Sequence, residues 1–265
     1  MVFTPVITAT VNGSVVSRDT VQRWEARRAT AVLTKLFSRI GGLALAEIAP
    51  DINPTWVLGA DLRTQKAALL TIKTGLGHAG IYALLRREIM ISQRLSRAAV
   101  TASCGRTTHS VIAVSAPGVD AERFATWFNN LTALNDEPTM VDAIADHYLL
   151  RGLPDGRQEV VETVGNSPLA TRFLVDYTAS DRLQVRADPD YPIQITGHAV
   201  HDDGLVIGGV RHQIRDCDGT LEALPTAEFP ALTPPSMVAA HRWHLAVEFS
   251  NWIEAFARTE HRRQS

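Results

Sequence analysis

The residues of this chain that could carry out chemistry are ordinary carboxylates, imidazoles and guanidiniums. Ser167 lacks the second glycine of a nucleophile elbow, and the sequence contains no phosphate-binding loop of the Walker type. Cys104 and Cys217 form no paired motif, so neither a cysteine zinc site nor a disulfide framework is predicted. An enzyme with this sequence is therefore expected to use acid–base and charge-assisted catalysis, with no cofactor and no metal.

Glu88 lies in a segment, Ile81 to Ser92, that fits either a strand or a helix. The run Ile89-Met90-Ile91 favours the strand by its β-branching and length, although apolar residues also recur at helical spacing. In a strand, Arg86 and Glu88 would emerge side by side on an apolar face. Such a pair is either a structural ion pair, which the sequence favours, or a site carboxylate with a cationic neighbour.

The motif Gly75-x-Gly77-x-x-Gly80 matches the dinucleotide-binding fingerprint by its letters. That fingerprint also needs an acidic residue about 20 positions later to hold the ribose. The sequence has no Asp or Glu between Glu88 and Asp120, so a nicotinamide site is not expected. We interpret the glycines as a flexible turn between two strands.

Several histidines suggest a metal site that their spacing does not favour. His198 and His201 lie three residues apart on an expected strand, so they point to opposite faces and cannot share an ion. His241, His244 and Glu248 lie along one side of the last expected helix. Because that side flanks the apolar stripe, a solvated rim is favoured over a zinc site.

Composition predicts a single soluble globular domain over residues 1–265. Hydrophobic residues make up 45% and charged residues 20%, which excludes a disordered chain. The formal net charge of −2 gives no long-range attraction for nucleic acids. The most apolar stretch, Ile40 to Pro50, is too short to span a membrane. Without a signal peptide or a disulfide framework, a cytoplasmic location is expected.

The order of elements predicts an α+β fold, an antiparallel sheet with flanking helices. Strands come in hairpins, as at Asn12-Gly13, and helices come in blocks, which argues against βαβ alternation. Expected helices begin near Asp19, Asp120, Val141 and Pro234, and the first stops at Gly41-Gly42. The expected strands are 6–11, 67–72, 107–116, 158–164, 171–178, 191–200 and 205–215.

Arg63, His78 and Glu88 stand fifteen and then ten residues apart. This spacing resembles the polar triad of the bacterial β-carboline-forming Pictet–Spenglerases of the marinacarboline and kitasetaline type. The motif spans about twenty-six residues, and the remainder is similar only in length and character. The resemblance implies a fold related to chorismate lyase, a homodimer and no cofactor.

The resemblance also implies an activity in alkaloid biosynthesis. L-tryptophan, or a close analogue, would condense with an aldehyde to a tetrahydro-β-carboline or β-carboline. Glu88 would stabilise the iminium and then remove the proton from indole C2. Arg63 would hold the carboxylate of an oxo-acid aldehyde, and His78 would orient the carbonyl or shuttle a proton. Arg86, beside Glu88, is expected to bind substrate.

Two other functions are compatible with the same residues. The first is a chorismate-lyase-like enzyme, or a binding module, for a small aromatic carboxylate that uses an arginine clamp. The second is a non-catalytic ligand-binding or interaction module in which Arg86 and Glu88 are merely paired.

Overall fold

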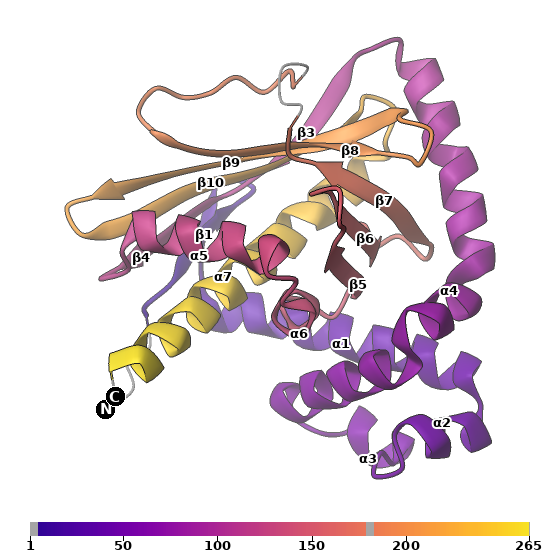
Figure 1. Cartoon of the computed structure of the whole chain (residues 1–265). Helices are drawn as coiled ribbons and strands as arrows, with labels where there is room; N and C mark the ends of the chain where they lie inside the picture. Colours follow the sequence, from indigo (N-terminus) through magenta and orange to yellow (C-terminus); the bar gives the residue numbers. More distant parts are fainter. Residues whose placement is uncertain (1–4, 179–182, 265) are drawn as a thin grey trace.

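A curved antiparallel sheet dominates the computed structural model of the chain, which describes residues 5–178 and 183–264. In Figure 1 the sheet curves around the long C-terminal helix, while other helices flank it. The ten strands of the described residues form one sheet in the order β2-β1-β4-β10-β9-β8-β7-β6-β5, with β3 paired to β10. Every pairing is antiparallel, so the predicted α+β class is confirmed. The likeness to chorismate lyase stays a prediction.

The elements are named in Figure 1 by their order along the chain. The strands are β1 (Thr8–Val11), β2 (Ser14–Ser17), β3 (Thr107–Val111), β4 (Ala113–Pro117), β5 (His147–Gly152), β6 (Gln158–Thr163), β7 (Ala170–Asp176), β8 (Ile193–Val200), β9 (Val206–Cys217) and β10 (Thr220–Pro230). The helices are α1 (Arg18–Ile40), α2 (Gly42–Ile48), α3 (Pro54–Leu58), α4 (Leu62–Ser103), α5 (Ala121–Ala133), α6 (Glu137–Asp142) and α7 (Pro235–Gln264).

The N-terminal hairpin and the first helix form largely as predicted. Asn12 and Gly13 both have positive φ angles, of 53° and 77°, as their hairpin turn requires. The cap of α1 is Ser17, whose hydroxyl accepts a backbone N–H of the first turn, rather than Asp19. Gly41, with a φ of 76°, ends the helix where the glycine pair predicted a stop.

Helix α4 replaces three features that were predicted differently. The expected strands 67–72 and 81–92, and the glycine turn between them, are all parts of this helix. Gly77 bends it, with φ 59° and ψ −180°, a conformation that is essentially restricted to glycine. Helical spacing buries Leu85 and Ile89 against the protein, and this tertiary packing outweighs the strand propensity of the β-branched run.

Two further predictions about elements are wrong. The expected strand 107–116 is broken at Ile112, whose N–H bonds the Pro225 carbonyl, so β3 and β4 both pair with β10. The expected helix from Val141 is instead the end of α6 followed by strand β5. Consequently His147 starts the strand at one edge of the sheet and not a helical turn.

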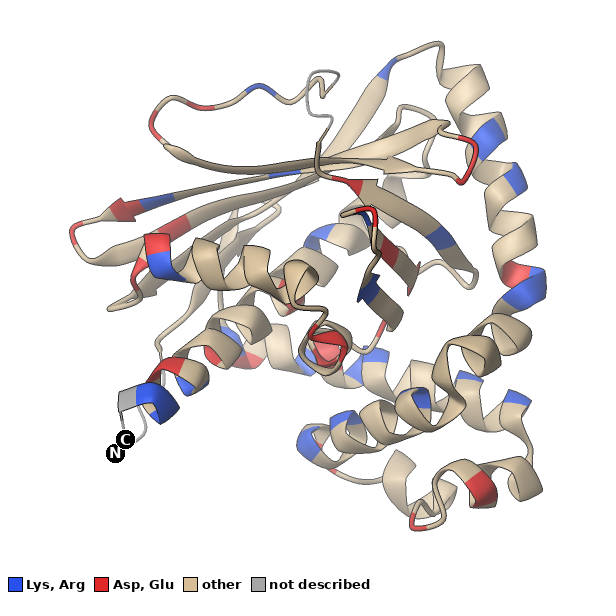
Figure 2. Ribbon diagram, viewed as in Figure 1, with Lys and Arg blue, Asp and Glu red and all other residues tan. Residues whose placement is uncertain are grey.

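The charge distribution of the chain and the apolar length of helix α4 do not by themselves determine where the protein is located. Figure 2 shows Lys and Arg interspersed with Asp and Glu over helices and strands, in keeping with the small net charge. Helix α4 is long and apolar enough to cross a membrane by length and composition alone. One such helix is weak evidence for a span, because core helices of soluble proteins meet the same criteria.

Buried apolar side chains form two clusters, and each packs helices against the sheet. One lies between the sheet and helices α5 and α7, and includes Phe124, Phe249 and Trp252. The other joins α1 and α4 to β5 and β6, and includes Leu36 and Leu85. Each fully buried large side chain stabilises the fold by about 1.5–3 kcal/mol, so the helices are held firmly on both sides of the strands.

Candidate functional site

A large cavity lies between the sheet, helices α5 and α7, and the C-terminal half of α4. Its volume is about 750 Å³, within the range of small-molecule sites. Most of its lining is apolar, and aromatic rings of Phe128, Phe173 and Trp252 contribute to it. Polar side chains gather in one part of this lining: His147, Glu162, His244 and Glu248.

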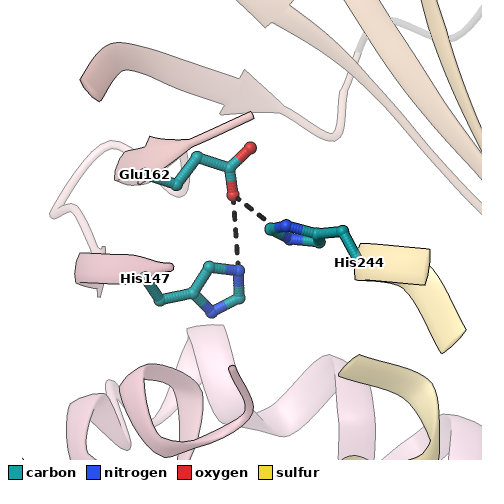
Figure 3. A group of neighbouring side chains, drawn as sticks. All are labelled: His147, Glu162 and His244. Carbon is teal, nitrogen blue, oxygen red and sulfur yellow. Dashed lines mark ion pairs between the residues drawn. The ribbon is translucent and has the colours of Figure 1, made fainter. Parts of the chain in front are cut away.

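Three elements bring these four side chains together, as Figure 3 shows for the first three. His147 on β5 and Glu162 on β6 are direct partners in the antiparallel register, so their side chains share one face of the sheet. A β-bulge follows His147, a distortion that commonly re-aims side chains beside functional sites. His244 and Glu248 lie four residues apart on one side of α7.

The distances within the cluster match a metal-binding arrangement. His147 Nε2 lies 3.3 Å from a carboxylate oxygen of Glu162 and 3.3 Å from one of Glu248. His244 Nε2 lies 3.8 Å from the same Glu162 oxygen. Ligands at about 2.0–2.2 Å from a tetrahedral zinc ion are separated by roughly 3.3–3.6 Å. Small side-chain shifts would therefore place an ion among these atoms.

Hydrogen bonding orients His147 toward the cluster. Its Nδ1 donates to the Met140 carbonyl at 3.0 Å, which leaves Nε2 facing the carboxylates. Metal-binding histidines commonly have such a carbonyl partner on the second ring nitrogen, because it fixes the tautomer. The Nδ1 atom of His244 is buried and has no hydrogen-bond partner among the described residues.

Strong electrostatic coupling accompanies this geometry. Burial disfavours a charge on His147, but hydrogen bonds to Glu162 and Glu248 outweigh burial and raise its pKa to about 10. Burial also opposes ionisation of Glu162, yet the nearby imidazoles lower its pKa to about 2. The pKa of Glu248 is raised, chiefly by burial. The cluster therefore holds a cationic group between carboxylates in an apolar cavity.

Four other polar side chains of the cavity are neutral hydrogen-bonding groups. Burial lowers the pKa of His212 to about 3 and that of His241 to about 4, so both imidazoles are uncharged near neutral pH. The Tyr177 hydroxyl donates to the Gln158 side chain at 3.0 Å. All four side chains line the cavity, where they could contact polar atoms of a bound compound.

The structure does not bring Arg63, His78 and Glu88 together. All three lie on α4, and a helix rises about 1.5 Å per residue, so Arg63 and His78 are roughly 22 Å apart along it. Arg63 is exposed near the beginning of the helix. None of the three is among the described residues that line the cavity.

His78 belongs to an ion-pair network outside the cavity. Its Nε2 lies 2.7 Å from Glu137, and its Nδ1 lies 2.8 Å from Arg151, which also pairs with Glu159. These contacts connect α4, just after its bend at Gly77, with α6 and the sheet. The geometry fits a structural role for His78.

Glu88 is buried and fully engaged by its neighbours. Lys35 of α1 donates to it at 2.9 Å, Arg39 forms a second ion pair, and the Ala170 N–H donates at 2.6 Å. Burial alone would raise the pKa of Glu88, but the hydrogen bonds from Lys35 and Ala170 outweigh burial and lower it. A base for neutral pH needs a higher pKa, so these surroundings suit an ion pair better than proton abstraction.

Arg86 is not a partner of Glu88. On a helix the two positions differ by about 200°, and Arg86 is exposed while Glu88 is buried. The expectation that they emerge side by side required a strand, which the structure does not contain here.

The cluster in the cavity was only partly visible in the sequence. The spacing of His241, His244 and Glu248 was noted, but the predicted solvated rim is wrong, because all three are buried. Helix α7 is covered on more than one side, which a single apolar stripe does not reveal. His147 and Glu162 come together only through the pairing of β5 with β6, which no local pattern of residues predicts.

Three further histidines, His198, His201 and His212, are buried. His201 Nε2 bonds the Ser96 hydroxyl at 2.8 Å. Only His212 of these three lines the cavity.

Comparisons with known proteins identify no family for this chain. No family model matches it, and no curated protein does. Among solved structures, it is similar to the crystal structure of Ara h 8.0201, with a TM-score of 0.35 and 13% sequence identity. That similarity covers 58% of this chain and 98% of the other. A similarity this weak carries no conclusion about activity or ligands.

Proposed function

We propose that this chain is a metal-dependent hydrolase that acts on a mostly apolar compound bound in the cavity. The observation that carries the proposal is the convergence of His147, Glu162 and His244, whose ligand atoms all lie within 4.8 Å of one another. Two histidines and a glutamate are the protein ligands of a well-known class of hydrolytic zinc sites. Glu248, 3.3 Å from His147, is available as a fourth ligand.

The charges of the cluster support a divalent cation. A bound metal ion would displace the proton that His147 holds in its absence. With both carboxylates ionised and both imidazoles then neutral, the four side chains carry a charge of −2 in a buried site. A divalent ion would make the site neutral, which removes most of the cost of burying the carboxylates. Nitrogen and carboxylate ligands together suit zinc better than calcium or magnesium.

The cavity supports hydrolysis of an apolar carbonyl compound. A zinc ion bound there would polarise a carbonyl oxygen and lower the pKa of a coordinated water to about 7. The aromatic and aliphatic lining would hold the hydrophobic part of the substrate and exclude bulk water. His212 and Tyr177 would supply neutral hydrogen bonds to its polar atoms.

The first test is metal binding. The purified chain should bind one zinc ion, measured by elemental analysis and by calorimetry after chelator treatment. Glu162→Gln should lower zinc affinity at least about 100-fold, because even the partners of ligands contribute 10- to 100-fold. The control is Glu222→Gln, whose carboxylate pairs with Arg215 outside the cavity and should leave affinity unchanged. Unchanged zinc binding in Glu162→Gln would contradict the assignment.

The second test is activity. Zinc-loaded protein is assayed with a panel of 4-nitrophenyl and 2-naphthyl esters and the corresponding amides, whose rings suit the apolar lining. Hydrolysis should require zinc and be lost in His244→Ala. Hydrolysis that persists after chelation would show that the metal is not used.

Pictet–Spengler condensation of tryptophan with an aldehyde remains a second proposal. Its support is an apolar cavity of about 750 Å³ that contains buried carboxylates, since the reaction needs a carboxylate base beside an indole. In this cavity Glu162 or Glu248 would be the base, in place of Glu88. The condensation product of tryptophan with a set of glyoxals, detected by mass spectrometry, tests it.

Paired variants distinguish the two positions for the base. If the resemblance assigns the site correctly, Glu88→Gln should lower condensation by about 10²- to 10⁴-fold. If the cavity is the site, Glu162→Gln should do so and Glu88→Gln should not. The absence of product in the wild type with every aldehyde would remove the proposal.

The remaining predictions about partners and location are also proposals. A chorismate-lyase-like site or binder for an aromatic carboxylate would need a cation in the cavity, because its carboxylates would repel the ligand. A homodimer is expected from the resemblance and is tested by light scattering. The two free cysteines are exposed and suit a reducing, cytoplasmic location.

A further inference from the structure

His241 is a buried imidazole of the cavity that is not one of the four proposed ligands. It precedes His244 by three residues on α7, and the two rings stack with centroids 4.9 Å apart and planes 12° apart. The ring of Phe229 packs edge-on against the His241 ring, with the two ring centroids 5.0 Å apart. Its side chain is therefore held rigidly beside the metal-binding cluster.

Ser110 of β3 fixes the direction of the His241 ring. The Ser110 hydroxyl lies 2.8 Å from His241 Nδ1, and both residues are buried. Among the described residues this is the only hydrogen bond of that hydroxyl. Because Nδ1 is occupied by Ser110 and the ring lines the cavity, Nε2 is the ring nitrogen left for a bound compound.

The same hydrogen bond selects one tautomer. A neutral imidazole has one N–H and one lone pair, and a buried hydroxyl with a single partner is most stable when it donates. If Ser110 donates to Nδ1, the proton of His241 must be on Nε2. The opposite tautomer would leave the hydroxyl proton buried without an acceptor, at a cost of about 1–3 kcal/mol.

We propose that His241, oriented by Ser110, donates its Nε2–H to the carbonyl oxygen of the substrate during hydrolysis. This inference rests on the proposed hydrolase function. Water adds a hydroxyl group to the acyl carbon, and the electron pair of the C=O bond moves to oxygen. That oxygen accepts the hydrogen bond from His241. The electron pair then re-forms the C=O bond, and the bond to the leaving group breaks. The leaving group takes the proton that water released when its hydroxyl group was added.

His241 ends each turnover unchanged, because it donates a hydrogen bond and transfers no proton. A fixed donor aimed at a developing oxyanion acts more strongly in the transition state than in the ground state. Its removal should consequently lower kcat more than it changes KM. Ser110 is a positioning residue, since it acts only through the tautomer of His241.

The kinetic test compares variants in the zinc-loaded full chain with the most rapidly hydrolysed ester of the panel. His241→Leu should lower kcat by about 10²- to 10³-fold, the effect of removing one oxyanion donor, while zinc stoichiometry stays at one. His241→Gln, which keeps an N–H donor, should recover part of the loss. Ser110→Ala should give a smaller loss. His109→Leu, at an exposed position of the same strand, is the control and should match the wild type.

A second readout keeps the inference separate from the proposed activity. In ¹⁵N-histidine-labelled, zinc-loaded protein, long-range ¹H–¹⁵N spectra report the tautomer of each ring, and His241→Gln identifies the relevant signal. The expected result is a protonated Nε2 in the wild type and a mixture of tautomers in Ser110→Ala. A protonated Nδ1 in the wild type, or an unchanged kcat in His241→Leu, would overturn the inference even if zinc-dependent hydrolysis is found. If no ester is hydrolysed, the Nδ1 tautomer alone would still overturn it.

Discussion

Lys73 is a buried ammonium group that lies outside the cavity and beneath the strand carrying His147. Its Nζ donates to the Ala145 carbonyl at 2.9 Å and lies 5.8 Å from the centre of the Tyr148 ring. Burial lowers the pKa of Lys73 to about 7, against the attraction of Asp146. One hydrogen bond and the face of one ring solvate the Lys73 ammonium group less well than water does. The free energy of unfolding should therefore depend on pH through this residue.

We predict that the wild type gains stability relative to Lys73→Met as pH rises from 7 to 9. The unfolded chain keeps the lysine proton up to about pH 10.4, whereas the folded chain releases it from about pH 7. Between these values the unfolded state binds more protons, so the free energy of unfolding increases with pH. The difference between the two proteins should change by roughly 2–3 kcal/mol over two pH units.

Urea denaturation at pH 7 and pH 9 measures this difference. Arg157→Met, which removes a half-exposed cation paired with Asp155, is the control and should show no comparable trend. A constant difference between wild type and Lys73→Met at both pH values would mean that the lysine is not perturbed by burial.

At the level of single residues, the sequence predicted which residues could be functional better than it predicted which residues are buried. The spacing of His244 and Glu248 on one helix was correct. Their exposure could not be inferred, since it depends on the strands that cover α7 from the other side. Glu88 was identified as a notable carboxylate, but its partners Lys35 and Arg39 come from a helix about fifty residues earlier.

At the level of elements, Glu88 connects α4 to α1 and to the beginning of β7. We predict that Glu88→Gln lowers the free energy of unfolding by about 1–3 kcal/mol, because charged hydrogen bonds to Lys35 and Arg39 are weakened while the side-chain shape is kept. Zinc affinity and ester hydrolysis should stay close to wild type. Thermal and urea denaturation, together with the zinc titration, check both parts.

The control for this variant is Glu222→Gln, which removes a half-exposed ion pair and should change stability by less than about 1 kcal/mol. A large loss of turnover in Glu88→Gln without a loss of stability would contradict this prediction and support a catalytic role for Glu88.

The bend in α4 gives a second prediction about elements. Gly77→Ala should lower the free energy of unfolding by about 1–3 kcal/mol, because a φ of 59° with a ψ of −180° is strained for any residue with a Cβ. Gly42→Ala is the matched control, at an exposed helical position where an added Cβ has open space. Equal stability of the two variants, measured by urea denaturation, would show that the bend can straighten without cost.

Strong local signals predicted elements correctly, and weak ones did not. The Asn12-Gly13 turn, the Gly41 stop and the Asp120 cap were confirmed, since each depends on a few adjacent residues. Helix α4 was mistaken for strands because its β-branched run and glycines outweighed a helical apolar pattern. The bend at Gly77 reconciles both signals, as it lets a helix continue across a glycine-rich segment.

At the level of the whole molecule, the proposed zinc site joins parts of the chain that the sequence keeps far apart. His147 and Glu162 belong to neighbouring strands near one edge of the sheet, and His244 belongs to the helix that closes the cavity. An ion bound to all three would oppose separation of α7 from the sheet. Zinc should accordingly act on the stability of the whole fold and not only on one loop.

We predict that zinc raises the Tm of the chelator-treated chain by about 8–16 °C when its concentration is 1,000 times the Kd, since binding then contributes about 4 kcal/mol and each kcal/mol shifts Tm by about 2–4 °C at this size. Scanning calorimetry with and without zinc measures the shift, and excess chelator should reverse it. His244→Ala should lose most of the shift, because it detaches α7 from the ion while β5 and β6 keep their ligands. A shift that survives in His244→Ala would show that zinc binds the sheet alone, so that closure of the cavity by α7 would not depend on the metal.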